Sequence, residues 1–88
     1  MLYRLFTENR NYDQLKSLVC HYFDGATLIT AEGIWQGNSE HSLIIEIECI
    51  YLCHNVPERI ERLCYDIKKL NQQDKILVQR IESDSQLV

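Results

Sequence analysis

Cysteine and histidine stand side by side at two places in the sequence, Cys20-His21 and Cys53-His54, and Cys49 lies four residues before the second pair. Four such side chains can hold zinc in a tetrahedron, but structural zinc sites usually combine two close CxxC or CxxH pairs, and this chain has none. A Cys–His couple for nucleophilic catalysis needs the side chains together in space, with a third group that orients the histidine. Sequence neighbours on an extended segment point apart instead. The spacing therefore predicts reduced thiols without a metal and no catalytic cysteine.

Two carboxylates, Glu46 and Glu48, are two residues apart in a strand-like run, so they share one face of a strand at about 7 Å from each other. Paired carboxylates can serve as general acid and base, but arginines on neighbouring strands explain them more simply as ion-pair partners. Gly33 and Gly37 flank Trp35 without the spacing of a phosphate-binding loop. The sequence therefore predicts a protein that is not an enzyme and uses no cofactor.

The overall charge narrows the choice of partners. The chain has 88 residues with 13 acidic and nine basic side chains, a net charge of −4. Non-specific binding to nucleic acid depends on clustered lysine and arginine, which this chain lacks. The apolar segment Met1–Phe6 is too short for a signal peptide, and no apolar run approaches the about 18 residues that span a membrane. We therefore expect one domain over residues 1–88 in the cytoplasm, with no membrane contact.

Hydrophobic periodicity predicts four strands and two helices. Each helix is expected to begin with a capping box, Asn11 with Gln14 and Asn55 with Glu58, and the first to end at Asp24-Gly25. The strands are expected over Leu2–Thr7, Ala26–Gln36, His41–Leu52 and Lys75–Ile81, and the apolar stripe of the second helix over Ile60, Leu63, Cys64, Ile67 and Leu70. The order βαββαβ predicts an α+β ferredoxin-like sandwich. Its antiparallel sheet would have strand order 4-1-3-2, with two helices on one face and residues 82–88 as a flexible tail.

Alternation along the strands assigns side chains to the two faces of this sheet. The uniformly apolar set Leu43, Ile45, Ile47 and Cys49 must face the helices, together with Tyr3 and Leu5. In the second strand the expected inward set is Ile29, Ala31, Gly33 and Trp35, so that Trp35 caps the core with its indole edge partly exposed. In the fourth strand we expect Leu77 and Ile81 inward. The opposite choice, which places Gln79 on the outer face, stays open.

Under these assignments the face opposite the helices is apolar, although an open sheet face normally alternates to polar residues. The expected apolar side chains are Leu2, Phe6, Leu28, Ile34, Ile44, Ile50, Ile76 and Val78, with glutamates on two strands and Arg4 and Arg80 on the others. We therefore predict a protein interface formed by Leu2, Arg4, Phe6, Leu28, Glu32, Ile34, Ile44, Glu46, Glu48 and Ile50. The side chains predicted to line a ligand pocket at a subunit boundary are Arg4, Arg10, Trp35, His41 and Arg80.

With this element order and the segment Gly33-Ile34-Trp35-Gln36-Gly37, the chain resembles small uncharacterised proteins of the PII/CutA-like ferredoxin-fold group. The resemblance covers Leu2 to Ile81 in element order. It implies trimers that hold small anionic ligands, often nucleotides, in clefts between subunits. The ligand loop of PII-like proteins is a long insertion between strands 2 and 3, whereas the link here is only Gly37–Glu40. Only the oligomeric habit is therefore carried over.

These observations favour a non-enzymatic homo-oligomer, a dimer or trimer, with a regulatory or sequestering role and a small anionic ligand at a subunit boundary. Two alternatives stay open. One is a small acidic inhibitor or adaptor, such as a viral factor directed against a host, that binds another protein through the same face. The other is a small ferredoxin-fold enzyme. The oligomeric state in solution separates the first two hypotheses, because only the leading one requires self-assembly.

Overall fold

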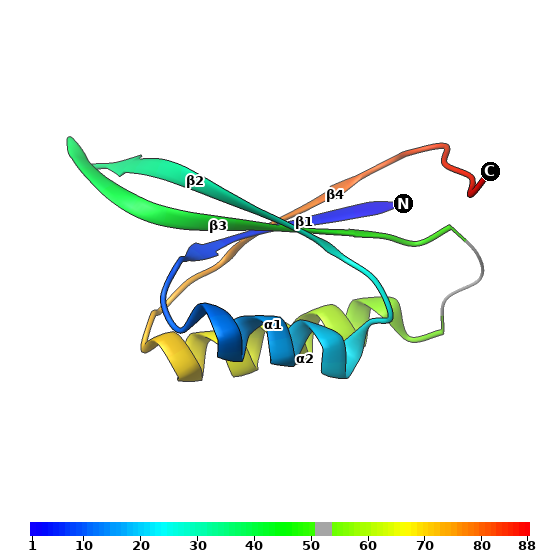
Figure 1. Ribbon diagram of the computed structural model, residues 1–88, viewed down its shortest axis with the longest axis horizontal. Coiled ribbons are helices and arrows are strands. Elements are labelled where there is room, and N and C mark those ends of the chain that lie inside the picture. Colours follow the sequence, from blue (N-terminus) through cyan, green and yellow to red (C-terminus); the bar gives the residue numbers. More distant parts are fainter. Residues whose placement is uncertain (51–53) are drawn as a thin grey trace.

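The βαββαβ order expected from the sequence is confirmed in the computed structural model, which describes residues 1–50 and 54–88. The elements are β1 Leu2–Glu8, α1 Tyr12–Tyr22, β2 Thr27–Trp35, β3 Asn38–Glu48, α2 Val56–Asn71 and β4 Leu77–Ile81. The strands form one antiparallel sheet in the order β2-β3-β1-β4, which is the predicted 4-1-3-2 read from the other edge. Both helices lie side by side under one face of this sheet (Figure 1). The predicted strand end at Leu52, and Cys53, lie outside the described residues.

The hydrophobic core fills the space between the two helices and the sheet face that they cover, the inner sheet face. Its members come from every element except the edge strands: Tyr3, Leu5, Leu15, Val19, Phe23, Leu43, Ile45, Ile47, Val56, Ile60, Leu63 and Ile67 are all buried. The faces predicted for β1 and β3, and the apolar stripe of α2, are therefore confirmed. Among the described residues, neither helix has the length and apolar character needed to cross a bilayer.

The two helix starts differ from the expected capping boxes. Asn11 and Asn55 do occupy the N-cap positions, but both have left-handed backbones, with φ of 58° and 57°, and neither makes a side-chain cap hydrogen bond. Asparagine tolerates this conformation better than other non-glycine residues, so these positions serve the sharp chain reversal before each helix. The expected helix stop at Asp24-Gly25 is also wrong, because α1 ends at Tyr22 with an extended Phe23 whose N–H donates to the Val19 carbonyl, and Gly25 does not have the positive φ of a glycine helix stop.

A buried polar cluster ties the end of α2 to β1 and to the start of α1. The Asn71 amide, 2% exposed, donates to the Glu8 carbonyl at 3.0 Å and to Gln73 Oε1 at 3.0 Å, while its Oδ1 accepts from Asn11 Nδ2 at 3.2 Å. Thr7 donates from its hydroxyl to the same Gln73 oxygen at 2.7 Å. Asn71 continues the buried stripe of α2 and is a polar group whose hydrogen bonds are met inside the protein.

We expect Asn71→Ala to lower the free energy of unfolding by about 1–3 kcal/mol, because the Glu8 carbonyl and Gln73 lose a buried donor. Urea unfolding followed by circular dichroism measures this change. Gln14→Ala, at an exposed position of α1, serves as the amide-removing control and should change stability by less than about 0.5 kcal/mol. Equal losses in the two variants would contradict a structural role for the cluster.

The side chains of β2 face the opposite way from the prediction. The chain reverses through a two-residue turn at Gln36 and Gly37, with φ of 51° and 80°, so that Trp35 pairs with Asn38. This register sets Leu28 opposite Ile45, on the inner face, and Ile29 opposite Ile44, on the outer one. The expected turn over Gly37–Glu40 would pair Gln36 with His41 and would leave the same residues of β2 on the inner face, so the turn is not the source of the error. Both faces of β2 carry aliphatic side chains, and alternation alone therefore did not distinguish them.

For β2 the corrected inner-facing residues are Leu28, Thr30, Glu32 and Ile34, and the outer-facing ones are Thr27, Ile29, Ala31, Gly33 and Trp35. Trp35 therefore does not cap the core, because it is 68% exposed on the outer side of the hairpin end. The β2–β3 hairpin projects past the ends of the helices (Figure 1). Ile34, 73% exposed, consequently also lacks a covering element, although it faces the helix side.

The facing of β4 is also reversed relative to the favoured prediction, and agrees with the alternative that was left open. The register pairs Leu5 with Val78 and Phe6 with Leu77. Val78 therefore shares the inner face and Leu77 the outer one, and Ile76 packs against the core. Each face of this strand carries apolar residues and one polar residue, Gln79 on the outer face and Arg80 on the inner one, so alternation alone did not decide its facing.

Candidate functional site on the outer sheet face

The sheet face opposite the helices, the outer sheet face, carries an apolar residue on each of its four strands in one continuous line. The pairings Ile29 with Ile44, Ile44 with Phe6, and Phe6 with Leu77 place these four side chains next to one another across the sheet. We call this set the apolar row. It begins at one sheet edge and ends at the other, because β2 and β4 are the two edge strands.

Water, rather than protein, covers the apolar row in the single chain. Ile29 is 40% and Leu77 59% exposed, while Ile44 and Phe6, on the central strands, are half-buried by their neighbours. An antiparallel sheet with one face in solvent normally places polar side chains there. A continuous apolar line on a solvent-facing sheet therefore indicates a surface that another molecule covers.

A polar row runs beside the apolar row and contains an ion pair. Thr27, Glu46, Arg4 and Gln79 are paired in this order across the sheet. Arg4 donates from Nη2 and Nε to Glu46 Oε2 at 2.7 and 2.8 Å, which confirms the predicted cross-strand partnership for Glu46. Because both side chains are partly exposed, the pair contributes at most about 1 kcal/mol to stability. Its main effect is to fix the Arg4 side chain against the sheet.

Glu48, at the end of the outer sheet face, is held by groups from both ends of the chain. Ser83 donates from its hydroxyl to Glu48 Oε1 at 2.5 Å, and the Met1 ammonium lies 3.6 Å from the same oxygen. The Ser83 hydrogen bond is the main reason that the pKa of Glu48 lies below its usual value. Ser83 belongs to the segment that the sequence predicted to be a flexible tail.

A hollow of about 680 Å³ opens at this end of the face, between the start of β2 and the C-terminal segment. Its lining combines aliphatic side chains with carboxylates: Leu2, Asp24, Gly25, Ala26, Thr27, Glu46, Glu48, Ile50 and Leu87. Four of the residues predicted for the interface, Leu2, Glu46, Glu48 and Ile50, therefore meet here. The volume falls within the range of small-molecule sites.

The side chains predicted for a ligand pocket do not come together within one subunit. The register puts Arg4 on the outer and Arg80 on the inner side, because their partners Gln79 and Tyr3 alternate. The guanidinium of Arg10 pairs with the Glu8 carboxylate near the start of α1. His41 lies opposite Glu32 on the inner side of the hairpin, away from the outer-facing Trp35.

Of the predicted interface residues, Leu28, Glu32 and Ile34 are not on the outer sheet face, because the facing of β2 is reversed. The sequence interpretation missed Ile29 and Leu77, which take their places in the apolar row, and Asp24 and Leu87, which line the hollow. Extending the pairing from the hairpin turn onto the known inner face of β3 would have placed Ile29 on the outer face. No local sequence pattern predicts that residues 83–87 lie against the end of the outer sheet face.

The three cysteines that the structure describes occupy separate places. Cys20 is exposed on α1, and Cys49 follows β3 and is half-buried against the core. Burial raises the pKa of the Cys64 thiol on α2 above its usual value, so this thiol stays protonated at neutral pH. Within residues 1–50 and 54–88, no three histidine, cysteine or acidic side chains are placed so that they could hold a metal ion.

Comparison with known proteins finds likeness at the level of fold. No protein-family profile matches the chain, and no curated protein sequence is similar to it. Among solved structures, a phage SAM lyase in complex with S-methyl-5'-thioadenosine is similar with a TM-score of 0.70 and 14% identity, over 88% of this chain and 76% of that one. The phage SAM lyase in the apo state is similar with a TM-score of 0.67 and 16% identity, over 88% of this chain and 75% of that one. A functionally unknown protein from Pediococcus pentosaceus is similar with a TM-score of 0.56 and 14% identity, over 98% of this chain and 95% of that one. At these identities the likeness establishes the shared fold.

Proposed function

We propose that this protein is a homo-oligomeric module whose outer sheet face packs against another copy of the chain and holds a small ligand at the subunit boundary. The observation that carries the proposal is the apolar row, which crosses all four strands and is not covered by either helix. A small domain buries a modest fraction of its surface on its own, so covering this row adds apolar burial that the isolated chain lacks.

The size of the face suits a weak to moderate association. Adjacent strands lie about 4.8 Å apart and pair over seven, five and nine residues, so the face covers roughly 350–450 Å² in projection. Side chains and the overhanging hairpin raise the accessible area towards the about 600 Å² per partner at which specific interfaces begin. We therefore expect an assembly that dissociates within the micromolar concentration range.

The hollow at the end of the outer sheet face is the ligand site in this proposal. Glu46 is neutralised by Arg4, whereas Asp24 has no basic partner within 4 Å in the described part of the chain. These charges favour a neutral or cationic ligand over the anionic one expected from the sequence. In the phage SAM lyase the same fold holds S-methyl-5'-thioadenosine. We propose a ligand of this class: the neutral thioether nucleoside, or S-adenosylmethionine, whose sulfonium carries a positive charge.

The chemistry of the lining suits such a molecule. Carboxylates can accept hydrogen bonds from ribose hydroxyls and from the adenine amino group, and they attract a sulfonium. Leu2, Ile50 and Leu87 offer aliphatic surface to the base and the thioether methyl group. A second copy packed on the apolar row would close the hollow from the side that is open to solvent.

We expect both S-methyl-5'-thioadenosine and S-adenosylmethionine to bind, as measured by isothermal titration calorimetry on the assembled protein. Asp24→Asn removes the lining carboxylate that has no basic group within 4 Å in the described part of the chain, and should weaken the binding of the sulfonium several-fold, but weaken that of the neutral thioether much less. Glu32→Gln, an equal charge change on the inner side of the hairpin, is the control and should leave both affinities unchanged. Absence of heat with both compounds would contradict this choice of ligand and leave self-assembly to be judged separately.

A second candidate function, favoured by the fold likeness to the phage SAM lyase, is an enzyme that breaks the bond between the sulfonium sulfur and the amino acid chain of S-adenosylmethionine. The bonding electron pair would stay on the sulfur, which gives S-methyl-5'-thioadenosine, and the carboxylate of the substrate would bond to the released carbon, which gives homoserine lactone. Chromatography of S-adenosylmethionine incubated with the protein distinguishes catalysis from binding. Product that accumulates in proportion to protein, beyond one equivalent, would establish turnover. If S-methyl-5'-thioadenosine forms at the same rate with and without the protein, the enzyme hypothesis is wrong and the binding function is retained.

A further inference from the structure

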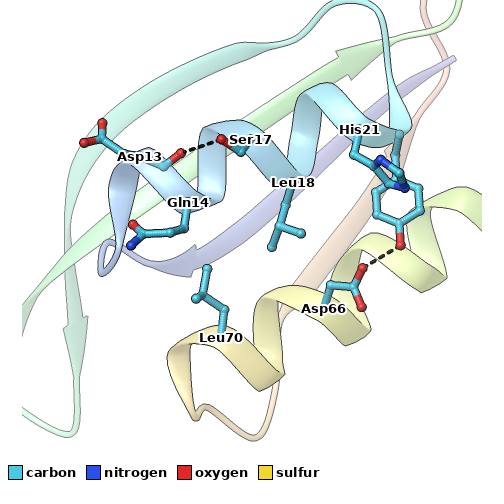
Figure 2. A pocket seen from close by; sticks show the side chains of 8 residues that line it. Asp13, Gln14, Ser17, Leu18, His21, Asp66 and Leu70 are labelled. Atoms are coloured by element: carbon cyan, nitrogen blue, oxygen red, sulfur yellow. Dashed lines mark hydrogen bonds between the residues drawn. The ribbon is translucent and has the colours of Figure 1, made fainter.

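A second hollow, of about 810 Å³, lies on the helix layer, far from the outer sheet face. It runs between α1 and α2 on the side that faces away from the sheet (Figure 2). Six of its lining residues come from one side of α1 and two from α2: Asp13, Gln14, Ser17, Leu18, His21, Tyr22, Asp66 and Leu70. We call this hollow the helix groove. It shares no lining residue with the hollow at the end of the sheet.

The helix groove has an apolar middle and a polar group at each end. Leu18 and Leu70, both partly buried, point toward one another across the middle (Figure 2). At one end Asp13 and Gln14 extend from the first turn of α1, and at the other Asp66 lies beside the last turn. The arrangement separates two carboxylates by a strip of hydrocarbon.

At the Asp66 end of the helix groove, a contact between the two helices fixes their relative position. Tyr22 donates from its hydroxyl to Asp66 Oδ2 at 2.5 Å, and the bond to this carboxylate raises the pKa of Tyr22 above its usual value. The ring of His21 stands edge-on to that of Tyr22, with 4.9 Å between their centroids. The hydrogen bond uses one oxygen of Asp66 and leaves the other able to accept from a ligand.

The lining of the groove carries a net negative charge, and Arg62 and Lys68, the nearest basic side chains to Asp66, belong to the adjoining hollow on the other side of Asp66. No lysine or arginine is among its lining residues, and over residues 1–50 and 54–88 neither Asp13 nor Asp66 has a basic group within 4 Å. The net charge of −4 adds a weak attraction for cations. An anionic ligand is therefore disfavoured, and a ligand with ammonium groups is complementary.

The separation of the carboxylates determines the shape of the cation. Asp13 and Tyr22, which holds Asp66, are nine residues apart on α1, or about 13 Å at 1.5 Å per residue. A linear aliphatic oligoamine, with an ammonium group at each end and methylene groups between, matches this pattern. Each ammonium would meet a carboxylate, and the methylene chain would cover Leu18 and Leu70.

We propose that the helix groove binds an aliphatic oligoamine, with its terminal ammonium groups at Asp13 and Asp66 and its methylene chain over Leu18 and Leu70. This inference is independent of the function proposed for the outer sheet face. The carboxylates are partly exposed, so each contact is worth at most a few-fold in affinity, and the two contacts act together through one flexible chain. Weak, selective binding in the high micromolar range is the expected result.

The test is a titration of the isotopically labelled protein with 1,8-diaminooctane, followed residue by residue by NMR. This diamine should shift the amide signals of α1 and of the Asp66 region. Putrescine, whose ammonium groups are too close together to reach both carboxylates, should bind several-fold more weakly. Butylamine and Mg²⁺ provide controls for a single charge and for charge without a methylene chain, and neither should produce the same set of shifts.

Asp13→Asn and Asp66→Asn should each weaken the binding of 1,8-diaminooctane about three- to fivefold, since an exposed ion pair contributes about this much. Asp66→Asn retains an oxygen that can accept the Tyr22 hydroxyl, so the helix contact survives. Asp74→Asn, an equal change of charge at an exposed position outside the groove, is the control and should leave binding unchanged. Equal losses in all three variants, equal binding of 1,8-diaminooctane and Mg²⁺, or shifts outside the groove would overturn the proposal.

Discussion

Replacing Ile45 by alanine should lower the free energy of unfolding by about 2–4 kcal/mol, through lost burial and the cavity that remains. Ile45 is fully buried at the centre of the sheet, opposite Leu5 on one side and Leu28 on the other. Because β1, β2 and β3 all meet at this side chain, the surrounding residues cannot close the space by moving a loop. Chemical denaturation of the purified variant measures the change.

Ile34→Ala is the matched control for this prediction, since it removes the same atoms from a side chain that is 73% exposed. It should cost less than about 0.5 kcal/mol. A loss of less than half a kcal/mol for Ile45→Ala would show that the core does not sit on the inner sheet face as described.

Replacing Ile44, the neighbour of Ile45 on the opposite face, by lysine should break the assembly while leaving the subunit folded. In the proposed interface the new ammonium lies within the apolar row, beside Ile29 and Phe6, and the nearby Glu46 already pairs with Arg4. A buried charge without a partner costs about 3 kcal/mol or more, which weakens association at least a hundredfold. In the single subunit the side chain points away from the helices.

Light scattering and far-ultraviolet circular dichroism of the Ile44→Lys variant test the two parts of this expectation. The variant should have the mass of one chain and the secondary structure of the wild type. Ile34→Lys, on the helix side of the hairpin end, is the matched control and should keep the wild-type mass. An Ile44→Lys variant that retains the wild-type mass would show that the apolar row is not the contact surface.

The sequence predicts the element order and the inner faces of β1 and β3 because these depend on local signals. Leu43, Ile45 and Ile47 alternate with partly polar neighbours, and the stripe of α2 repeats at helical spacing, so that only one burial pattern is consistent. The facing of β2 lacks such a signal, because aliphatic side chains stand on both of its faces, Leu28 and Ile34 on the inner one and Ile29 on the outer one. A wrong choice at one residue of a strand reverses the face of every residue in it.

The sequence predicted an apolar outer sheet face but identified only some of its residues. Ile44, Phe6 and Leu2 lie on the outer sheet face as expected, whereas Ile29 replaces Leu28 because both faces of β2 carry aliphatic side chains. The contacts of the C-terminal segment, such as that of Ser83 with Glu48, join residues 35 positions apart. No periodic pattern encodes such a contact, so it requires the folded structure.

The side chains expected to cap the two helices were also predicted incorrectly. Asn11 and Asn55 are in the positions that the capping-box pattern indicates, yet their side chains do not cap the helices. Asn11 instead reaches the end of α2, where its amide donates to Asn71 Oδ1 and to the Leu70 carbonyl. The Asn11 side chain therefore makes a tertiary contact with α2 in place of the local cap that the sequence pattern predicts.

The mass of the wild-type protein in solution, measured by sedimentation equilibrium across the micromolar range, tests self-association through the outer sheet face most directly. We expect the mass to rise with concentration from that of one chain, 10.4 kDa, to at least twice that value. The Ile44→Lys variant should stay at 10.4 kDa under the same conditions. A wild-type protein that remains at the mass of one chain throughout would contradict self-association through this face. It would then favour a partner other than a second copy of this chain on the apolar row.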